Sequence, residues 1–451
     1  MKKLKKLVLI LLILFLVLTV WYLDFTDPIV TWNAPSDVGK DSQIGLQIQD
    51  EGKGLRSIEL ILRQADTTHS LYSQTHPRTV FPWKQGPPME EILISTQDWA
   101  SELGLQDGTV ELTVQVEDQS SIWLFSRKVE ESRSFNLDTK PPRADVLSDQ
   151  HYIRQGGSEA VLYRVTEPGC SSGVQVGENS FLGYPVPQRG EDTYIALFAM
   201  AHDQGPETPV SLWAADAAGN RSETRFWYKP MPASFRKRRI EITDRFINSV
   251  APEILSHSPT VEKQSTLLET FLQINRELRA ENNQLISDLS NDSRPQPLWS
   301  EPFLQLSNSE VESVFADHRT YYYGGEPVDE QTHLGFDLAS LARSAVEASN
   351  SGSVVFADYL GIYGNCVILD HGLGLFSLYG HLSSLDVEKG QNVSRGESLG
   401  RTGQTGLAGG DHLHYSMIIQ GVQVSPLEWW DPNWVRLHVM VKLRKPEAEA
   451  G

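Results

Sequence analysis

Glycine divides the C-terminal part of this chain into short apolar runs, and this restricts the folds that the segment can adopt. Seventeen of the 34 glycines lie between Gly324 and Gly421. They separate runs such as VVFA, CVIL and LFSLYG. Short strands joined by glycine turns are typical of antiparallel sheets. We therefore predict a compact antiparallel β-domain over residues 298–434.

Strand patterns also fill residues 24–230. Apolar and polar residues alternate in TVELTVQVEDQSS at 109–121, the period of a half-buried strand. This stretch weakly resembles PVSLWAADAAGNRS at 209–222. The paired prolines of DTKPPR, 138–143, cannot continue a sheet ladder or a helix and so mark a joint between two repeats.

Two β-sandwich modules of about 100 residues fit this spacing. We place module 1 at residues 24–139 and module 2 at residues 143–230. The DTxPP joint and the DxAGN turn resemble those of bacterial immunoglobulin-like spacer domains. That resemblance implies an immunoglobulin-like fold for both modules.

A helical period replaces the strand pattern in residues 233–297, which we predict to be a helical linker ending at SRPQP. Its apolar residues follow three-and-four spacing: Leu267, Phe271, Ile274, Leu278, Leu285 and Leu289. Such a segment forms either a short dimerising coiled coil or an amphipathic helix packed on its neighbour. The second is favoured because sustained heptads are lacking. The position of the linker also suggests the hypothesis that it covers a catalytic groove.

The N-terminus predicts export. Residues 1–6, MKKLKK, precede an apolar run over residues 7–23 without a cleavage pattern after it. We predict a single-pass signal anchor in the cytoplasmic membrane, with the lysine-rich tip inside and residues 24–451 on the extracytoplasmic side. A cleaved signal peptide is the alternative, and it exports the same body.

Charge and cysteine content exclude other classes of protein. Asp plus Glu is 58 against 39 for Lys plus Arg, a formal net charge of −19. Because affinity for nucleic acid comes mainly from clustered Lys and Arg, nucleic-acid binding is disfavoured. The two cysteines, Cys170 and Cys366, are far apart and are predicted to be unpaired thiols, which excludes cysteine-rich metal sites.

Five residues of the glycine-rich segment form a candidate metal site. HLGFD supplies His333 and Asp337, whose spacing places them on one face of a strand or a helix. HLH supplies His412 and His414 on one face of a strand, and LYGHL supplies His381. Catalytic zinc takes three protein ligands of this kind. His333, Asp337 and one histidine of the pair would supply them, leaving two histidines for proton transfer and charge stabilisation.

The combination of HLGFDLA, YGHL, GRTGQTG and HLHY resembles the LytM-type, lysostaphin-like zinc metallopeptidases of family M23. The resemblance covers about a quarter of the chain. It implies one Zn²⁺ per catalytic domain, held by His333, Asp337 and His414, with His412 and His381 as catalytic histidines. Ser416 departs from the family pattern, in which glutamate is frequent at this position, but no ligand is lost.

The resemblance also implies a substrate, the peptide part of peptidoglycan. His412 would act as general base and then acid, and His381 would hydrogen-bond the oxyanion. We therefore expect a mainly β, multidomain, membrane-anchored zinc metalloendopeptidase. Its β-modules and helical linker would serve as a spacer and as candidate sites for protein partners, with a polar tail at residues 435–451.

Two alternatives remain open. A non-cleaving LytM-like regulator would activate a partner cell-wall hydrolase, and a zinc protease would act on exported proteins. Outside the five-residue cluster the sequence offers histidines such as His438 no partner. The segment around His318 is expected to be a loop entering the domain, where Arg319 and the tyrosines Tyr321 to Tyr323 could line the groove.

Overall fold

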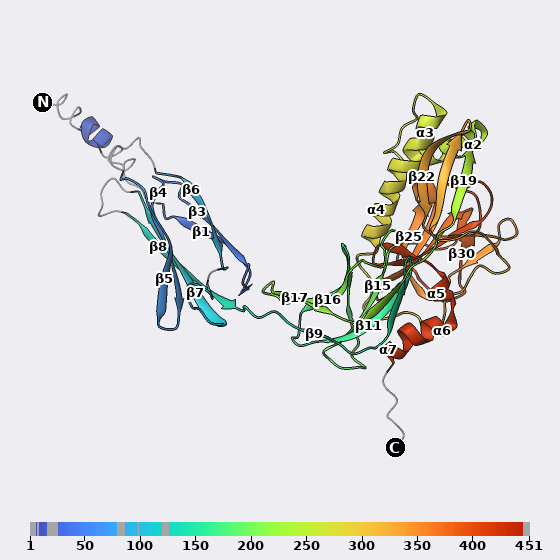
Figure 1. Ribbon diagram of the computed structural model, residues 1–451. Helices are drawn as coiled ribbons and strands as arrows, with labels where there is room; N and C mark the ends of the chain where they lie inside the picture. The colour runs from blue at the N-terminus through green and yellow to red at the C-terminus, as the bar shows by residue number, and fades with distance from the viewer. Residues whose placement is uncertain are drawn as a thin grey trace, which may run out of the picture. The chain divides into compact units, whose positions relative to one another are not determined.

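The protein is mainly β-structure and divides into two compact units (Figure 1). The computed structural model describes residues 6, 9–15, 26–78, 86–97, 99–119 and 126–444. Unit 1 comprises Met1–Pro142 with Ala215–Arg221, and unit 2 comprises Arg143–Ala214 with Ser222–Gly451. Module 1 therefore belongs to unit 1, whereas most of module 2 shares unit 2 with the C-terminal domain.

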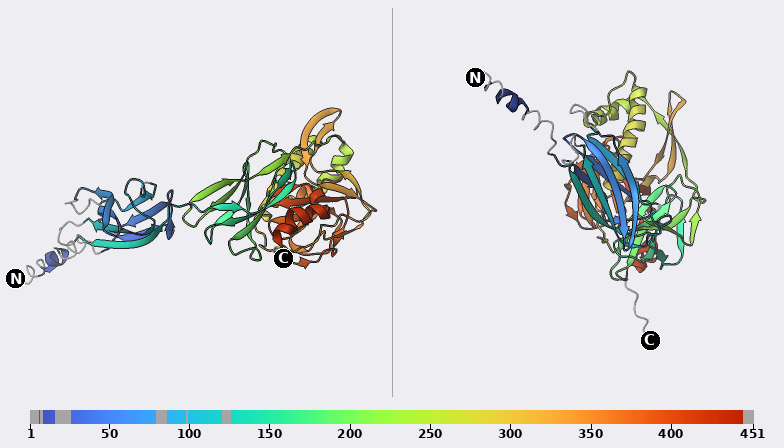
Figure 2. Two further views of the ribbon diagram at one scale, coloured as in Figure 1. Left: turned by 60° about the horizontal axis from the view of Figure 1, so that its bottom comes forward. Right: turned by 90° about the vertical axis from the view of Figure 1, so that its left-hand side faces the viewer.

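Module 1 is a β-sandwich of a sheet with strand order β1-β3-β6 and a sheet with order β2-β8-β7-β4-β5 (Figure 2, right). Its core lies between the sheets because alternate residues point inward: Ile58, Leu60 and Leu62 are buried in β4. The strands are β1 Ile29–Asn33, β2 Asp37–Val38, β3 Gln43–Gln49, β4 Leu55–Gln64, β5 Thr67–Thr75, β6 Met89–Ser95, β7 Gly108–Asp118 and β8 Lys128–Leu137.

Module 2 is a second sandwich, with sheet orders β14-β15-β11-β9 and β13-β12-β16-β17 and a parallel pair β10-β18. Its strands are β9 Ala144–Val146, β10 His151–Arg154, β11 Ser158–Val165, β12 Ser171–Val176, β13 Asn179–Leu182, β14 Tyr184–Pro185, β15 Thr193–Ala199, β16 Val210–Ala215, β17 Arg221–Arg225 and β18 Tyr228–Met231. The sandwich architecture of both modules is as expected; an immunoglobulin-like fold stays a prediction.

The C-terminal domain is antiparallel, as the glycine pattern predicts. Its main sheet has the order β20-β23-β31-β27-β26-β25-β29, with β32 paired to β31, beside a sheet β24-β30-β28. The strands are β20 Glu310–Ser313, β23 Phe336–Ala339, β24 Ala345–Glu347, β25 Gly352–Tyr359, β26 Asn365–Asp370, β27 Leu375–Leu382, β28 Ser384–Leu385, β29 Asn392–Val393, β30 Ser398–Arg401, β31 Leu413–Ile419 and β32 Val422–Val424; a short helix, η3 Gly361–Tyr363, precedes β26.

The helical segment packs on this domain as an amphipathic element. It contains β19 Lys237–Ile242, α2 Asp244–His257, α3 Leu267–Gln273, the π-turn η2 Ile274–Leu278 and α4 Arg279–Leu289. α3 begins at a capping box between Thr266 and Glu269. Phe271 and Ile274 share one hydrophobic core with Tyr363 of the C-terminal domain. Figure 1 shows the helices alongside β19 and β22.

β19 belongs to a separate three-stranded sheet with the order β19-β21-β22, in which it runs parallel to β21. The other two strands are β21 Asp317–Tyr323 and β22 Glu326–His333. The segment around His318, expected to be a loop, is therefore a strand. The pairing could not be predicted from this polar, tyrosine-rich sequence, because β19 lies far away in the sequence and β22 is reached across a turn.

The C-terminal helices pack against module 2 (Figure 2, left). They are α5 Leu427–Trp430, α6 Pro432–Trp434, the π-helical η4 Val435–Met440 and α7 Val441–Leu443. The start of the expected polar tail is thus helical. Val435 and Val439 are buried because they meet apolar residues of module 2. Residues 445–451 lie outside the described residues.

At the other end of the chain, residues 9–15 are helical. Among the residues that the structure describes, none belongs to a helix that is both long and apolar enough to cross a membrane. Much of the predicted anchor, residues 7–23, lies outside the described residues, so it stays a prediction. Both cysteines are buried and neither forms a disulfide, as expected.

Candidate active site

Three neighbouring strands bring the predicted site residues together. β31 lies between β23 and β27, and its His414 pairs with Asp337 on one side and Gly380 on the other. His381 follows Gly380 directly, and His412 lies just before β31, where it pairs with Gly403. His333 ends β22. All five residues that the sequence singles out therefore meet at one end of the main sheet.

Three of them converge on a single point. Asp337 Oδ1 lies 2.9 Å from His333 Nε2 and 3.0 Å from His414 Nδ1, and the two ring nitrogens are 3.1 Å apart. Ligands about 2.1 Å from a tetrahedral zinc stand about 3.4 Å apart. The donor set, two imidazoles and a carboxylate, fits zinc, and the three atoms need to separate by only a few tenths of an ångström.

Backbone and hydroxyl groups fix which nitrogen of each ligand ring faces this point. His333 Nδ1 donates to the carbonyl of Val314 at 3.0 Å, so Nε2 carries the lone pair. His414 Nε2 donates to Ser416 Oγ at 3.0 Å, and Ser416 in turn donates to the Leu334 carbonyl. Ser416, where the family pattern often has glutamate, thus orients a predicted ligand.

The charge states also suit a metal. Burial alone would raise the pKa of Asp337, but the neighbouring histidines, His333 foremost, hold that pKa well below its usual range. Burial, and then the neighbouring His333, lower the pKa of His414 to about 4 despite the nearby carboxylate. An ionised carboxylate and a neutral imidazole are the forms that bind metal.

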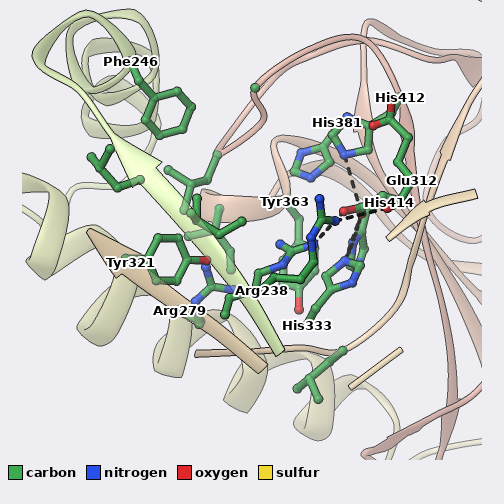
Figure 3. A pocket seen from close by; sticks show the side chains of 18 of the residues that line it. Arg238, Phe246, Arg279, Glu312, Tyr321, His333, Tyr363, His381, His412 and His414 are labelled. Carbon is green, nitrogen blue, oxygen red and sulfur yellow. Dashed lines mark hydrogen bonds and ion pairs between the residues drawn. The ribbon is translucent and has the colours of Figure 1, made fainter. Parts of the chain in front are cut away.

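The remaining two histidines form a second pair beside the ligands. The ring centres of His381 and His412 are 4.8 Å apart, and His412 Nε2 lies 3.6 Å from Asp337 Oδ1 (Figure 3). Each ring donates from Nδ1 to a backbone carbonyl at 2.8 Å, that of Thr405 for His381 and that of Gly410 for His412. Nε2 of both rings is left for chemistry.

The backbone at His381 adopts φ 63°, a left-handed conformation that residues other than glycine rarely take. Residues held in this region persist where the surrounding structure enforces the conformation, and they concentrate at functional sites. Here the hydrogen bond to Thr405 supplies part of that constraint.

A cavity of about 410 Å³ opens onto these residues (Figure 3). The five site residues line it, together with side chains that the sequence did not place at the site. Arg238 and Ile242 come from β19, and Phe246 and Phe271 come from α2 and α3. The helical segment lines the cavity as a wall, and Tyr321 of β21 contributes to the same surface.

Arg319 is a further residue of the site. The guanidinium nitrogen Nη2 of Arg319 donates to Asp337 Oδ2 at 2.8 Å. The sequence suggested only that Arg319 could line a groove, because nothing in its spacing links it to Asp337. The alternation of Asp317, Arg319 and Tyr321 along a strand was the available signal, since it places all three on one face.

Residues 331–426 match the model of peptidase family M23, which confirms the resemblance; all five site residues lie within the match. Over 96 residues, 21% of this chain, the sequence is 40% identical to the peptidoglycan DD-endopeptidase ShyA of Vibrio cholerae. Over 107 residues, 24% of this chain, it is 33% identical to the murein hydrolase activator EnvC of Escherichia coli. These matches span only 22% and 26% of the lengths of the two relatives.

One solved structure, an M23 peptidase from Pseudomonas aeruginosa, aligns with 60% of this chain and 93% of its own, at 22% identity and a TM-score of 0.38.

Proposed function

We propose that this chain, whose residues 331–426 match peptidase family M23, is a membrane-anchored zinc endopeptidase that cuts peptide bonds in peptidoglycan. The observation that carries the proposal is the convergence of Asp337 Oδ1, His333 Nε2 and His414 Nδ1 within 3.1 Å of one another beside a pair of histidines. Support for the substrate comes from the 40% identity to a peptidoglycan DD-endopeptidase.

His333, Asp337 and His414 would hold the metal. Bound zinc supplies a Lewis acid for the scissile carbonyl and lowers the pKa of water at the site. The chain's own groups do the rest: Val314 and Ser416 hold the ligand rings in their metal-binding tautomers. The cavity would receive the peptide.

The two other histidines would act on the reacting groups, one by proton transfer and one by stabilising charge. We assign proton transfer to His412, because its Nε2 faces the ligand cluster at 3.6 Å from Asp337 Oδ1. His381 would stabilise the oxyanion. Its Nδ1 proton is used by Thr405, so its Nε2 can donate only after the ring has taken up a second proton.

The extracytoplasmic location belongs to the same proposal. A single-pass anchor over residues 7–23 would leave residues 24–451 facing the wall, with modules 1 and 2 as a spacer and as sites for protein partners. Treatment of intact spheroplasts with a protease would degrade the body and spare only the N-terminal tip. Full protection of the body would reject this topology.

The activity is tested by incubating the full chain with purified sacculi, with and without a chelator. Release of peptide fragments that stops with the chelator and returns with Zn²⁺ is expected. His414→Ala should lose zinc and activity together. His412→Ala should keep zinc and lose activity on the order of 10²-fold or more. His257→Ala, an exposed histidine of α2 outside the site, is the matched control.

The identity to a murein hydrolase activator favours one alternative, a regulator that does not cut. Zinc binding without release of any fragment, combined with stimulation of a separate wall hydrolase, would establish it in place of the proposal. Cleavage of an unfolded exported protein but not of sacculi would instead favour the third reading, a protease of exported proteins.

A further inference from the structure

Arg319 and Asp337 form a tight pair at the edge of the ligand cluster. Arg319 Nη2 and Asp337 Oδ2 are 2.8 Å apart, and the two side chains are only 18% and 12% exposed. Asp337 therefore divides its oxygens: Oδ2 accepts from the guanidinium, while Oδ1 faces His333 and His414. One carboxylate oxygen is left for a metal.

The Arg319 side chain is committed to this contact. Within the described ranges, its hydrogen bond to Asp337 is the one that the guanidinium makes, and its Nε is buried without an acceptor. Burying a guanidinium with most of its donors unused is unfavourable. The position is explained if the function of the side chain is to hold Asp337.

A second pair, whose carboxylate lies on the same strand β21 as Arg319, shows what a purely structural tie looks like. Arg236 Nη2 likewise donates to Asp317 Oδ2 at 2.8 Å, and Arg236 Nε donates to Asp317 Oδ1 at 2.9 Å. Asp317 is fully buried, and its carboxylate contacts Arg238 as well but none of the predicted ligands. The two pairs share their chemistry and differ in whether the carboxylate belongs to the cluster.

We propose that Arg319 is a positioning residue that fixes Asp337 as a one-oxygen zinc ligand. The proposal rests on the zinc peptidase function proposed above. Without the guanidinium, Asp337 can rotate and offer both oxygens, or turn away from His333 and His414. Arg319 acts through Asp337 and need not touch the substrate.

The test measures Zn²⁺ affinity of the full chain by competition with a colorimetric chelator. Arg319→Gln should weaken zinc binding about 10–100-fold, the usual effect of removing a partner of a metal ligand. Arg319→Lys should lie between, because the ammonium keeps the charge and one hydrogen bond but not the planar fork. Arg236→Gln is the matched control: it should lower the thermal stability and leave zinc affinity unchanged.

Substitution with Co²⁺ gives a second readout that a structural role would not move. Four-coordinate Co²⁺ absorbs visible light more strongly than five- or six-coordinate Co²⁺. Arg319→Gln should weaken this absorption as Asp337 becomes free to bind through both oxygens, whereas Arg236→Gln should keep the wild-type spectrum.

The outcomes separate the two proposals. If wild-type protein binds no zinc and releases nothing from sacculi, the proposed function fails. If wild-type protein binds zinc and Arg319→Gln binds it equally well, or if Arg236→Gln weakens it as much as Arg319→Gln does, the role of Arg319 is overturned and the peptidase function stands.

Discussion

In module 1, strand β8 alternates between exposed and half-buried positions along most of its length, with Glu130, Ser132 and Ser134 exposed, and it reaches the core near its end. In module 2, strand β11 is buried at every position except Arg164. Both strands belong to sandwiches of similar size and sequence spacing. The difference lies in what covers the second face of the sheet in module 2, because this module shares one hydrophobic core with the C-terminal domain.

The contact between β11 of module 2 and the C-terminal helices is not only apolar. Glu159 of β11 is fully buried and pairs with Lys442 at 3.0 Å and with His438 at 2.7 Å. Burial acts to raise the pKa of Glu159, but His438 and then Lys442 outweigh it and hold the pKa below its usual range. This pair ties β11 to the C-terminal helices. Module 2 is therefore packed into one compact unit with the C-terminal domain.

The largest expected effect comes from breaking this buried pair. Glu159→Ala leaves Lys442 buried, with only the carbonyl of Ala160 as an acceptor, and should destabilise unit 2 by about 3–5 kcal/mol. Chemical denaturation of the full chain measures the loss. A change below about 1 kcal/mol would mean that water reaches Lys442 and that module 2 is less closely joined than the contacts indicate.

A smaller effect, opposite in sign, is expected at Glu428, which accepts hydrogen bonds from the Ser158 backbone N–H and hydroxyl. Burial raises its pKa to about 7, above the ordinary value of 4.5. The folded state then holds a proton that the unfolded chain releases between pH 4.5 and 7, so stability falls as pH rises through this window.

Glu428→Gln removes that charge and keeps an acceptor for Ser158. The variant should be more stable than wild type at pH 8 by up to about 3 kcal/mol, and the gain should vanish below about pH 4.5. Thermal unfolding across this pH range checks both ends. A gain that does not change with pH would show that packing, and not ionisation, separates the two proteins.

The smallest effect is expected on the open face of module 1. Lys128 Nζ lies 3.8 Å from Glu117 Oε2, and the lysine side chain is 76% exposed. Lys128→Ala should change stability by less than about 0.5 kcal/mol, since a solvated pair gains little. The same denaturation experiment measures it. A loss comparable to that of Glu159→Ala would erase the distinction between the two modules.

Much of the fold follows from local patterns. Alternation predicts the sandwich of module 1, and glycine spacing predicts the antiparallel C-terminal domain. The sequence of β11, SEAVLYRV, already lacks the alternation of β8, KVEESRSFNL, and a continuous apolar run is typical of a strand covered on both faces. The identity of the cover could not be predicted, because α7 lies more than 270 residues further along the chain.

The site divides in the same way. His333, Asp337, His381, His412 and His414 could be found because spacing of two or four residues and a family pattern mark them. Arg238 and Phe246 could not, because they reach the cavity through the pairing of β19 with β21 and the packing of α2. For Arg319 the alternation along β21 marks the face of the strand but not its partner Asp337, because that contact depends on tertiary structure.

The buried pair of Glu159 and Lys442 also has a consequence for the order in which the protein is made. Its members are separated by 283 positions in the sequence. During synthesis, module 2 emerges long before the helix that covers its second face. Until that helix follows, an unpaired carboxylate and an apolar surface stay open. Unit 2 therefore completes its packing only after α7 has emerged, so a chain that stops short of α7 is left with an uncovered sheet.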